Sequence, residues 1–223
     1  MKLRHEWKHE ITPADCLVLT SRLSAVARRD AHGENGRYMI RSLYFDDLRD
    51  TALREKIDGV NRREKFRIRF YNGDASYICL EKKTKQNGLC GKRSVLLSAH
   101  EVQSLLDGDL DWMPDSGRAL IQELYWKMKT AGLRPKTIVD YTRDAFVFPA
   151  GNVRVTLDSG IRTGLQSTDF LNSECVTVPA GDAPVILEVK WNDFLPDVIR
   201  NAVQLPGRRT SSFSKYAACR VYG

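Results

Sequence analysis

The sequence lacks several features that would assign it to a common class of protein. No stretch approaches the roughly 18 consecutive apolar residues of a membrane-spanning helix, and the first residues carry no apolar segment typical of a secretory signal. We therefore expect a cytoplasmic protein without membrane insertion. The five cysteines are scattered and form no Cys-x-x-Cys pair, which argues against a disulfide framework or a zinc site and favours reduced thiols.

Common catalytic motifs are absent as well. The chain has no Gly-x-Ser-x-Gly or Gly-x-Gly-x-x-Gly sequence, and Gly91-Lys92-Arg93-Ser94 fails as the end of a P-loop because Gln86 stands where that motif needs glycine. His5 and His9 have metal-ligand spacing for a helix, but they are expected on a strand, where a structural role is favoured. Phosphoryl transfer can dispense with such groups when the acceptor is an ionised phosphate, because no proton need be removed.

The positive charge of the chain is concentrated in one segment. Lys and Arg outnumber Asp and Glu by 35 to 28, a net charge of +7. Residues 54–93 contain twelve basic and five acidic residues, so this segment holds the whole excess and the rest is neutral. A local cation excess predicts a polyanionic ligand such as nucleic acid, anionic lipid or a phosphate chain, with a solvated basic face as the alternative.

Helix and strand signals alternate along the chain without a long linker. Capping residues and apolar spacing predict helices over residues 12–29, 46–58, 98–106, 116–130 and 196–203. β-rich runs predict strands over residues 37–45, 65–71, 77–84, 92–97, 135–140, 145–148, 153–158 and 185–191. We therefore expect residues 1–223 to form a single domain of the α+β class.

Charged residues alternate with apolar ones along the expected strands. Arg67 and Arg69 alternate with Phe66, Ile68 and Phe70, so the charges share one face. The same split recurs over residues 5–10, 77–83, 153–158 and 185–190, and also over residues 37–42, where the charged face would carry Arg37, Met39 and Arg41. One such strand fits an ordinary sheet with one face in water. Six favour a sheet that curls closed around a charged lumen, with helices on its apolar outside.

The mixture of charges on these faces favours one class of polyanion. Arg and Lys bind phosphate through charge-assisted hydrogen bonds, and carboxylates can hold a divalent ion that bridges phosphate oxygens. A phosphate chain with a metal ion would satisfy both signs. Nucleic acid is disfavoured, because the charged strands offer few aromatic residues for base stacking and a closed tunnel excludes a duplex.

Six short motifs occur in an order that is specific to one family. They are Glu6-Trp7-Lys8, Phe66-Arg67-Ile68-Arg69-Phe70-Tyr71, Leu80-Glu81-Lys82-Lys83-Thr84, Asp140-Tyr141-Thr142-Arg143, Leu187-Glu188-Val189-Lys190 and Phe213-Ser214-Lys215-Tyr216. Over nearly its whole length the chain resembles the VTC domain, the polyphosphate polymerase domain of the vacuolar transporter chaperone complex, within the triphosphate tunnel metalloenzyme superfamily. The resemblance implies a closed antiparallel β-barrel of eight strands with helices packed on its outside. It also implies transfer of the γ-phosphoryl group of ATP to a growing polyphosphate chain, with Mn²⁺ or Mg²⁺ as cofactor.

The resemblance also implies the site residues, position by position. The catalytic phosphate ligands would be Lys8, Arg67, Arg69, Lys83, Arg143 and Lys215, the further substrate-binding residues Lys92, Tyr141, Ser214 and Lys190, and the metal ligand Glu188. Arg93 is an alternative to Lys92. The tunnel triphosphatases carry Glu-x-Glu-x-Lys where this chain has Glu6-Trp7-Lys8-His9-Glu10, a departure that disfavours both a hydrolase and a metal role for Glu6.

Two other functions remain open on the same fold. One is a non-catalytic sensor of polyphosphate or another polyanion, and the other is a metal-dependent triphosphatase with water as the acceptor. A carboxylate at Glu188 favours catalysis, because a pure anion receptor has little use for a metal ligand. The expected partners are ATP and polyphosphate, without nucleic acid, and coupling to a membrane would need a membrane-protein partner.

Overall fold

The structure is a computed structural model that describes residues 3–182 and 184–221. Its strands are β1 (His5–Ile11), β2 (Arg28–Arg29), β3 (Arg37–Asp46), β4 (Arg63–Tyr71), β5 (Asp74–Gln86), β6 (Leu89–Leu97), β7 (Arg134–Phe148), β8 (Val153–Thr163), β9 (Val178–Pro179) and β10 (Val185–Trp191). Its helices are α1 (Pro13–Val26), α2 (Thr51–Ile57), α3 (Ala99–Leu106), α4 (Ala119–Ala131), α5 (Asp197–Ala202) and α6 (Lys215–Cys219), with a 3₁₀ turn η1 (Ala150–Asn152). None of the helices in these ranges is long and apolar enough to cross a membrane.

Most expected elements are present, but several bounds differ: β8, for example, continues to Thr163 instead of ending at residue 158. The two strands expected over residues 135–140 and 145–148 are one continuous strand, β7. The first helix ends at Val26, because the chain turns extended at Ala27 and pairs with β7 as β2. The second helix begins at Thr51 instead of Asp46, whose buried carboxylate accepts the backbone N–H groups of Ala52 and Leu53.

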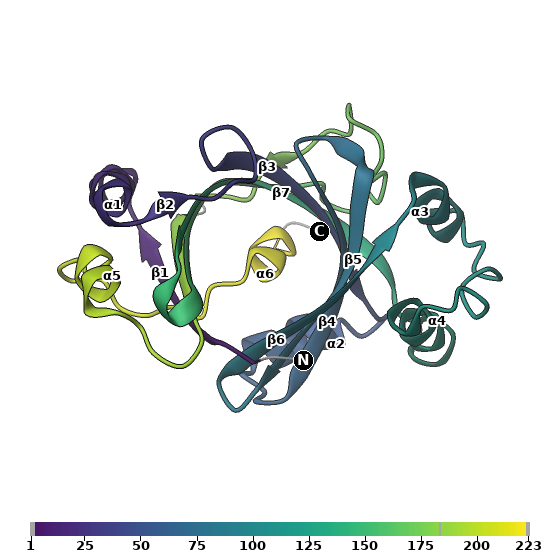
Figure 1. Cartoon of the computed structure of the whole chain (residues 1–223). Helices are drawn as coiled ribbons and strands as arrows, with labels where there is room; N and C mark the ends of the chain where they lie inside the picture. The colour runs from purple at the N-terminus through teal and green to yellow at the C-terminus, as the bar shows by residue number, and fades with distance from the viewer. Residues whose placement is uncertain (1–2, 183, 222–223) are drawn as a thin grey trace.

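The strands form one antiparallel sheet that curls strongly around a central space (Figure 1). Its main path has the order β1-β10-β8-β7-β3-β4-β5-β6, while β2 pairs with β7 and β9 with β8. The two edge strands meet where the backbone N–H groups of Arg4 and Cys90 each donate to the other's carbonyl oxygen, both at 3.0 Å. Among the described residues this is the one bridge between the edges. The eight-strand path is therefore a curled sheet whose edges touch at one point, without a ladder along the seam.

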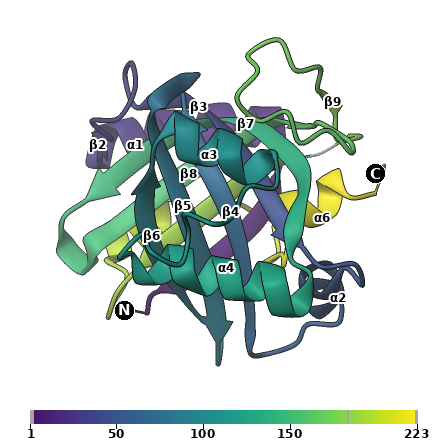
Figure 2. The same cartoon turned by 90° about the vertical axis from the view of Figure 1, so that its right-hand side faces the viewer.

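Helices cover the apolar outer face of the sheet. α3 and α4 lie across β4, β5 and β6 (Figure 2), where Phe66, Ile68 and Phe70 pack against helical residues such as Val102 and Leu124. α1 and α5 pack on the opposite side of the molecule against β8 and β10 (Figure 1). Burying apolar surface on this side leaves the other face of each strand directed to the central space.

α6 occupies one end of the central space (Figure 1). Tyr216 stacks on Tyr44 with ring centroids 5.0 Å apart, and its hydroxyl donates to Asp46 at 2.7 Å. Thr163 donates to the carbonyl oxygen of Cys219 at 3.0 Å. These contacts hold the C-terminal segment against the inner face of the sheet.

The inner face of β3 is not the one predicted from the sequence. Ser42 pairs with Arg69 and Tyr44 with Arg67 across the β3–β4 ladder, so the even-numbered residues of β3 face inward. Arg41 lies on the outer face, where its guanidinium binds the carboxylate of Asp140 at 2.9 Å. The prediction that Arg37, Met39 and Arg41 face the lumen is therefore wrong. A charged residue can alternate with apolar ones on the outer face when a neighbouring strand supplies its counter-charge.

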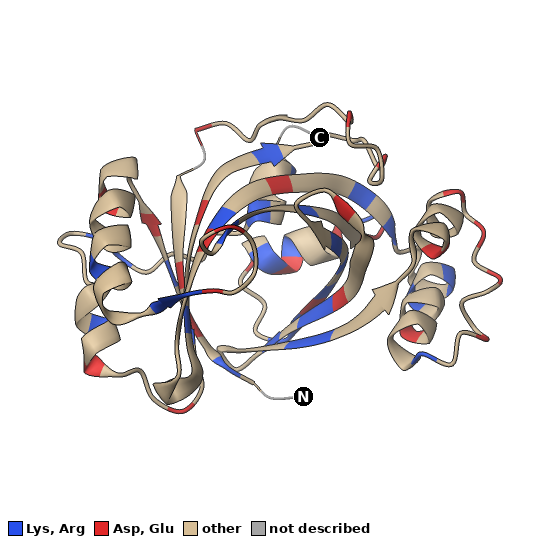
Figure 3. Ribbon diagram, turned by 45° about the horizontal axis from the view of Figure 1, so that its top comes forward, with Lys and Arg blue, Asp and Glu red and all other residues tan. Residues whose placement is uncertain are grey.

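The other five strands direct their charged faces inward as expected. Basic and acidic positions are interspersed on the strand segments around the central space (Figure 3). These residues include Glu6 and Lys8 on β1, Arg67 and Arg69 on β4, Glu81 and Lys83 on β5, Arg154 on β8, and Glu188 and Lys190 on β10. On the outer side of β1, the ring of His5 stacks on Trp191 with centroids 5.3 Å apart, in keeping with a structural histidine.

Candidate functional site

A cavity of about 430 Å³, the central cavity, lies inside the curled sheet. Its wall comes from β1, β3, β4, β5, β6, β7, β8 and β10 and from the segment leading into α6. Of the described residues, eleven basic and three acidic ones line it: Arg4, Lys8, Lys65, Arg67, Arg69, Lys83, Lys92, Arg143, Arg154, Lys190 and Lys215, with Glu6, Glu81 and Glu188. This cation excess in a concave wall suits a polyanion.

All eleven site residues predicted from the sequence lie in the wall of the central cavity. They are Lys8, Arg67, Arg69, Lys83, Lys92, Tyr141, Arg143, Glu188, Lys190, Ser214 and Lys215. The individual roles given to them stay predictions. Lys92 reaches the cavity, whereas Arg93, the alternative at this position, binds Glu123 on the outer face at 2.7 Å.

The site also contains residues that the sequence prediction did not include. Lys65 lies on the same face of β4 as Arg67 and Arg69, so alternation alone could have found it, and Arg154 lies on the face of its strand that alternation assigned to the lumen. Tyr44 follows from the corrected inner face of β3. Arg4 reaches the cavity because the edges of the sheet meet beside it, which no local pattern indicates.

Arg67 is held by a buried carboxylate. The Nε and Nη2 atoms of Arg67 donate to Oε2 of Glu81 at 2.7 and 2.6 Å, and Lys92 binds the other carboxylate oxygen at 2.8 Å. Burial opposes ionisation of Glu81, which is 1% exposed, but Arg67 and its neighbours lower the pKa of this carboxyl well below its usual range. The Tyr44 hydroxyl accepts from Nη1 of Arg67 at 2.8 Å. The orientation of this guanidinium is thus fixed before any ligand binds.

A second buried carboxylate arranges Arg143 and Lys215. Asp158, fully buried, accepts from Nε and Nη2 of Arg143 at 2.6 and 2.7 Å and pairs with Lys215 at 2.6 Å. Burial raises the pKa of Asp158, but the two cations outweigh this effect and keep it ionised. The Tyr141 hydroxyl accepts from Nη2 of Arg69 at 2.9 Å, which joins this cluster to β4.

Two carboxylates and several lysines meet where β1 pairs with β10. Lys190 binds Glu188 at 2.6 Å, and Lys8 lies 3.1 Å from Glu6 and 3.4 Å from Glu188. Burial opposes ionisation of Glu6, yet Lys8 and Lys83 help to lower its pKa to about 2. Burial likewise opposes ionisation of Glu188, but Lys190 and Lys8 hold its pKa well below the usual range. Both carboxylates are therefore charged at neutral pH.

The cations of the wall outnumber its carboxylates, and two lysines and one tyrosine in it have lowered pKa values. Burial lowers the pKa of Lys83 to about 7, because the attraction of Glu6 is offset by Lys190 and Lys8. Burial also lowers the pKa of Lys65 to about 8. Burial would raise the pKa of Tyr44, but Arg67 and Lys65 lower it to about 7. Without a ligand, the wall therefore carries groups that are only partly charged near neutral pH.

A family model described as the VTC domain matches residues 3–222. The chain belongs to the VTC domain family. Among solved structures, it is similar to a candidate adenylate cyclase from Bacillus halodurans, with a TM-score of 0.51 and 15% identity over 85% of this chain and 80% of that one. It is also similar to the PH1012 protein of Pyrococcus horikoshii OT3, with a TM-score of 0.51 and 12% identity over 95% and 96% of the two chains. These likenesses show a shared fold, and no curated protein matches the sequence.

The metal expected for this VTC domain has two carboxylates available to it. The described residues contain no group of three or more His, Cys, Asp or Glu side chains that could hold an ion by themselves. Glu188 and Glu6 lie on neighbouring strands, and Oε2 of Glu6 is buried without a hydrogen-bond partner. Mg²⁺ is commonly held by one or two carboxylates together with substrate phosphates and water. The residues therefore fit a divalent ion that arrives with a phosphate ligand.

Proposed function

We propose that this VTC domain is an ATP-dependent polyphosphate polymerase, which transfers the γ-phosphoryl group of ATP to a phosphate chain in the central cavity. The observation that carries the proposal is the composition of the wall, where eleven basic residues stand against three acidic ones. Arg and Lys bind phosphate oxygens through charge-assisted hydrogen bonds. The meeting of the sheet edges at Arg4 and Cys90 supports a wall that surrounds such a chain as a closed tunnel.

The chemistry needs positioning and charge neutralisation more than a general base. The acceptor is a terminal phosphate that is already ionised, so no proton has to be removed from it. Arg67 and Arg143, each fixed by a buried carboxylate, would orient the phosphoryl groups. Lys83 would become fully protonated beside the bound phosphate and add positive charge there. Glu188 and Glu6 would hold Mn²⁺ or Mg²⁺, which neutralises charge on phosphate oxygens.

A non-catalytic polyanion sensor is the second candidate. The observation that favours it is that Glu188 already pairs with Lys190 at 2.6 Å and lies 3.8 Å from Arg143, so this carboxylate has a structural partner without any metal. A triphosphatase would use the same phosphate ligands with water as the acceptor. The three functions differ in what becomes of ATP.

The test is to incubate the purified protein with ATP and Mn²⁺ and to separate polyphosphate from free phosphate. A polymerase yields polyphosphate and ADP, a triphosphatase yields free phosphate and ADP, and a sensor leaves ATP intact. Arg69→Met, on the inner wall, should abolish product formation, and Arg93→Met, on the outer face, is the matched control that should retain it. Absence of polyphosphate from the wild-type reaction would overturn the proposal.

A further inference from the structure

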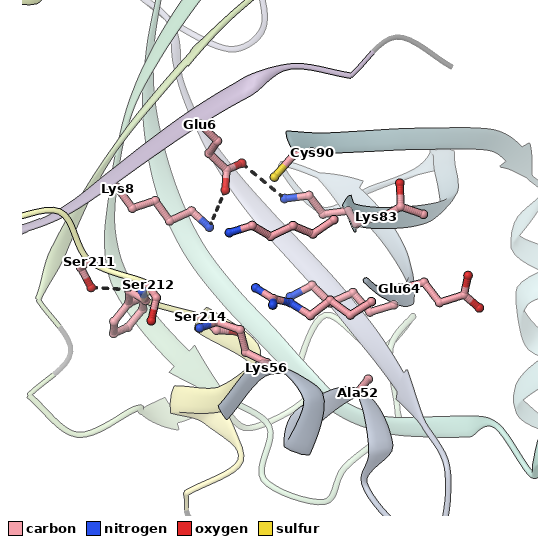
Figure 4. Close-up of a pocket in the computed structure, with 15 residues that line it drawn as sticks. Glu6, Lys8, Ala52, Lys56, Glu64, Lys83, Cys90, Ser211, Ser212 and Ser214 are labelled. Carbon is pink, nitrogen blue, oxygen red and sulfur yellow. Dashed lines mark hydrogen bonds and ion pairs between the residues drawn. The ribbon is translucent and has the colours of Figure 1, made fainter. Parts of the chain in front are cut away.

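A second, smaller cavity of about 120 Å³, the side cavity, adjoins the central cavity (Figure 4). The two share Glu6, Lys8, Lys65, Lys83, Cys90, Phe213 and Ser214 in their walls. The rest of the side cavity comes from α2, from β4 and β5 around Arg63 and Lys85, and from the segment before α6. A ligand in the central cavity that is long enough would therefore continue into the side cavity.

The side cavity is rich in cations that have no counter-charge of their own. No carboxylate of the described residues lies within 4.0 Å of the amines of Lys56, Lys65 or Lys85. Glu64, which also borders the cavity, binds Lys82 at 2.5 Å and Lys127 at 2.7 Å. In Figure 4, Lys8, Lys56 and Lys83 extend toward the same space, whereas Glu64 points away from it. The acid nearest these lysines is thus committed elsewhere.

An ordinary solvated basic surface does not account for this arrangement. Lys56, Arg63 and Lys85 are half-buried in a concave wall instead of extending into water. Burial lowers the pKa of Lys56, and the neighbouring Arg63 and Lys8 lower it further. Like charges gathered in such a wall repel one another, and a bound anion relieves that repulsion. Phe213 is the one aromatic residue among the lining residues, so the wall offers little for a nucleobase.

We propose that the side cavity is a subsite for the part of a phosphate chain that extends beyond the central cavity, with Lys56 and Lys85 as its ligands. This proposal rests on the proposed function, because the chain that the subsite holds is the substrate or product of that reaction. The subsite gives the protein a preference for chains longer than a triphosphate. Tripolyphosphate, held in the central cavity, leaves the side cavity empty.

The test compares binding of sodium tripolyphosphate and of size-fractionated polyphosphate several times as long, by calorimetry at one ionic strength and without ATP. The wild type should bind the longer chain more tightly. Lys56→Gln/Lys85→Gln should lose at least about tenfold in affinity for the longer chain, since hydrogen bonds to charged groups are among the stronger ones. Its affinity for tripolyphosphate should change by less than about threefold, as expected for the loss of distant charges.

Lys129→Gln/Arg200→Gln is the matched control, because both side chains lie on outer helices away from the two cavities. It removes the same charge and should keep the preference for the longer chain. Thermal unfolding of each variant checks that it is folded. Equal losses for both ligands, no loss for either, or a wild type without chain-length preference would overturn the subsite. This experiment measures binding and does not depend on catalysis. A protein that binds long chains preferentially but synthesises no polyphosphate would therefore overturn the proposed polymerase activity and leave the subsite standing.

Discussion

Lys83 is the residue whose charge we expect to change most when a phosphate chain binds. Its amine lies 4.0 Å from Glu6 and faces the repulsion of Lys190 and Lys8 in a buried wall. Burial and this repulsion lower its pKa to about 7 from the ordinary 10.5. A phosphate oxygen beside the amine supplies the missing negative charge and restores a high pKa. Binding should therefore draw a proton from solution onto Lys83.

The size of this proton uptake follows from the pKa. An amine with a pKa of about 7 is about half protonated at pH 7 and about one-tenth protonated at pH 8. If the bound state is fully protonated, Lys83 takes up about 0.5 proton at pH 7 and about 0.9 at pH 8. Affinity for the phosphate chain should accordingly fall as the pH rises above 7, by up to about tenfold per pH unit.

Calorimetry with tripolyphosphate in two buffers of different ionisation enthalpy measures the proton uptake. The ligand releases protons of its own, so the informative quantity is the difference between the wild type and Lys83→Arg, whose guanidinium stays charged throughout. The wild type should take up about 0.9 proton more than Lys83→Arg at pH 8. Lys129→Arg, on an exposed helix position, should behave as the wild type does. Equal proton uptake by the wild type and Lys83→Arg would refute the reasoning.

Three further outcomes can be measured. Glu188→Gln keeps the side-chain shape and removes a negative charge, so it should retain tripolyphosphate binding and lose metal-dependent ATP consumption. If this variant consumed ATP at the wild-type rate with the same Mn²⁺ requirement, the metal role of Glu188 would be ruled out. Arg67→Met deprives the buried carboxylate of Glu81 of its closest partner and should lower the free energy of unfolding in urea by about 3–5 kcal/mol, with Arg67→Met/Glu81→Gln recovering part of the loss. The folded-state pKa of Lys83 is lowered, so the unfolded chain binds more protons than the folded protein between pH 7 and 10.5. The free energy of unfolding of the ligand-free protein should therefore increase as the pH rises through this window. The increase should be smaller in Lys83→Met.

Strand alternation carried most of the prediction from the sequence. Because side chains of a strand alternate between its faces, the charges of β1, β4, β5, β8 and β10 could be assigned to one side before their partners were known. The ordered motifs identified the VTC family, which the family match confirms. The eleven predicted residues come from seven separate segments, and the curled sheet brings them to one cavity.

The parts that the sequence did not predict depend on contacts between distant segments. Arg41 faces outward because Asp140, about a hundred residues later, neutralises it across the β3–β7 pair. Arg4 reaches the site through the bridge to Cys90 at the seam of the sheet. Neither contact leaves a local pattern in the sequence. Alternation could place Arg67 and Glu81 on the same face of the sheet. That Arg67 contacts Glu81 and lowers the pKa of this carboxyl could be seen only in the structure.

The cations of the cavity fall into two groups that contribute differently to binding. Arg67 and Arg143 are each tied to a fully buried carboxylate, so they are already in place and little side-chain entropy is lost when a phosphate chain binds. Lys65 and Lys83 lack such a partner, and their lowered pKa values show that the fold holds them at an energetic cost without a ligand. A bound phosphate chain raises the pKa of these lysines, so that they take up protons from solution and the cost is removed. The two arginines should therefore determine where the chain lies, and Lys65 and Lys83 should determine how strongly its affinity depends on pH.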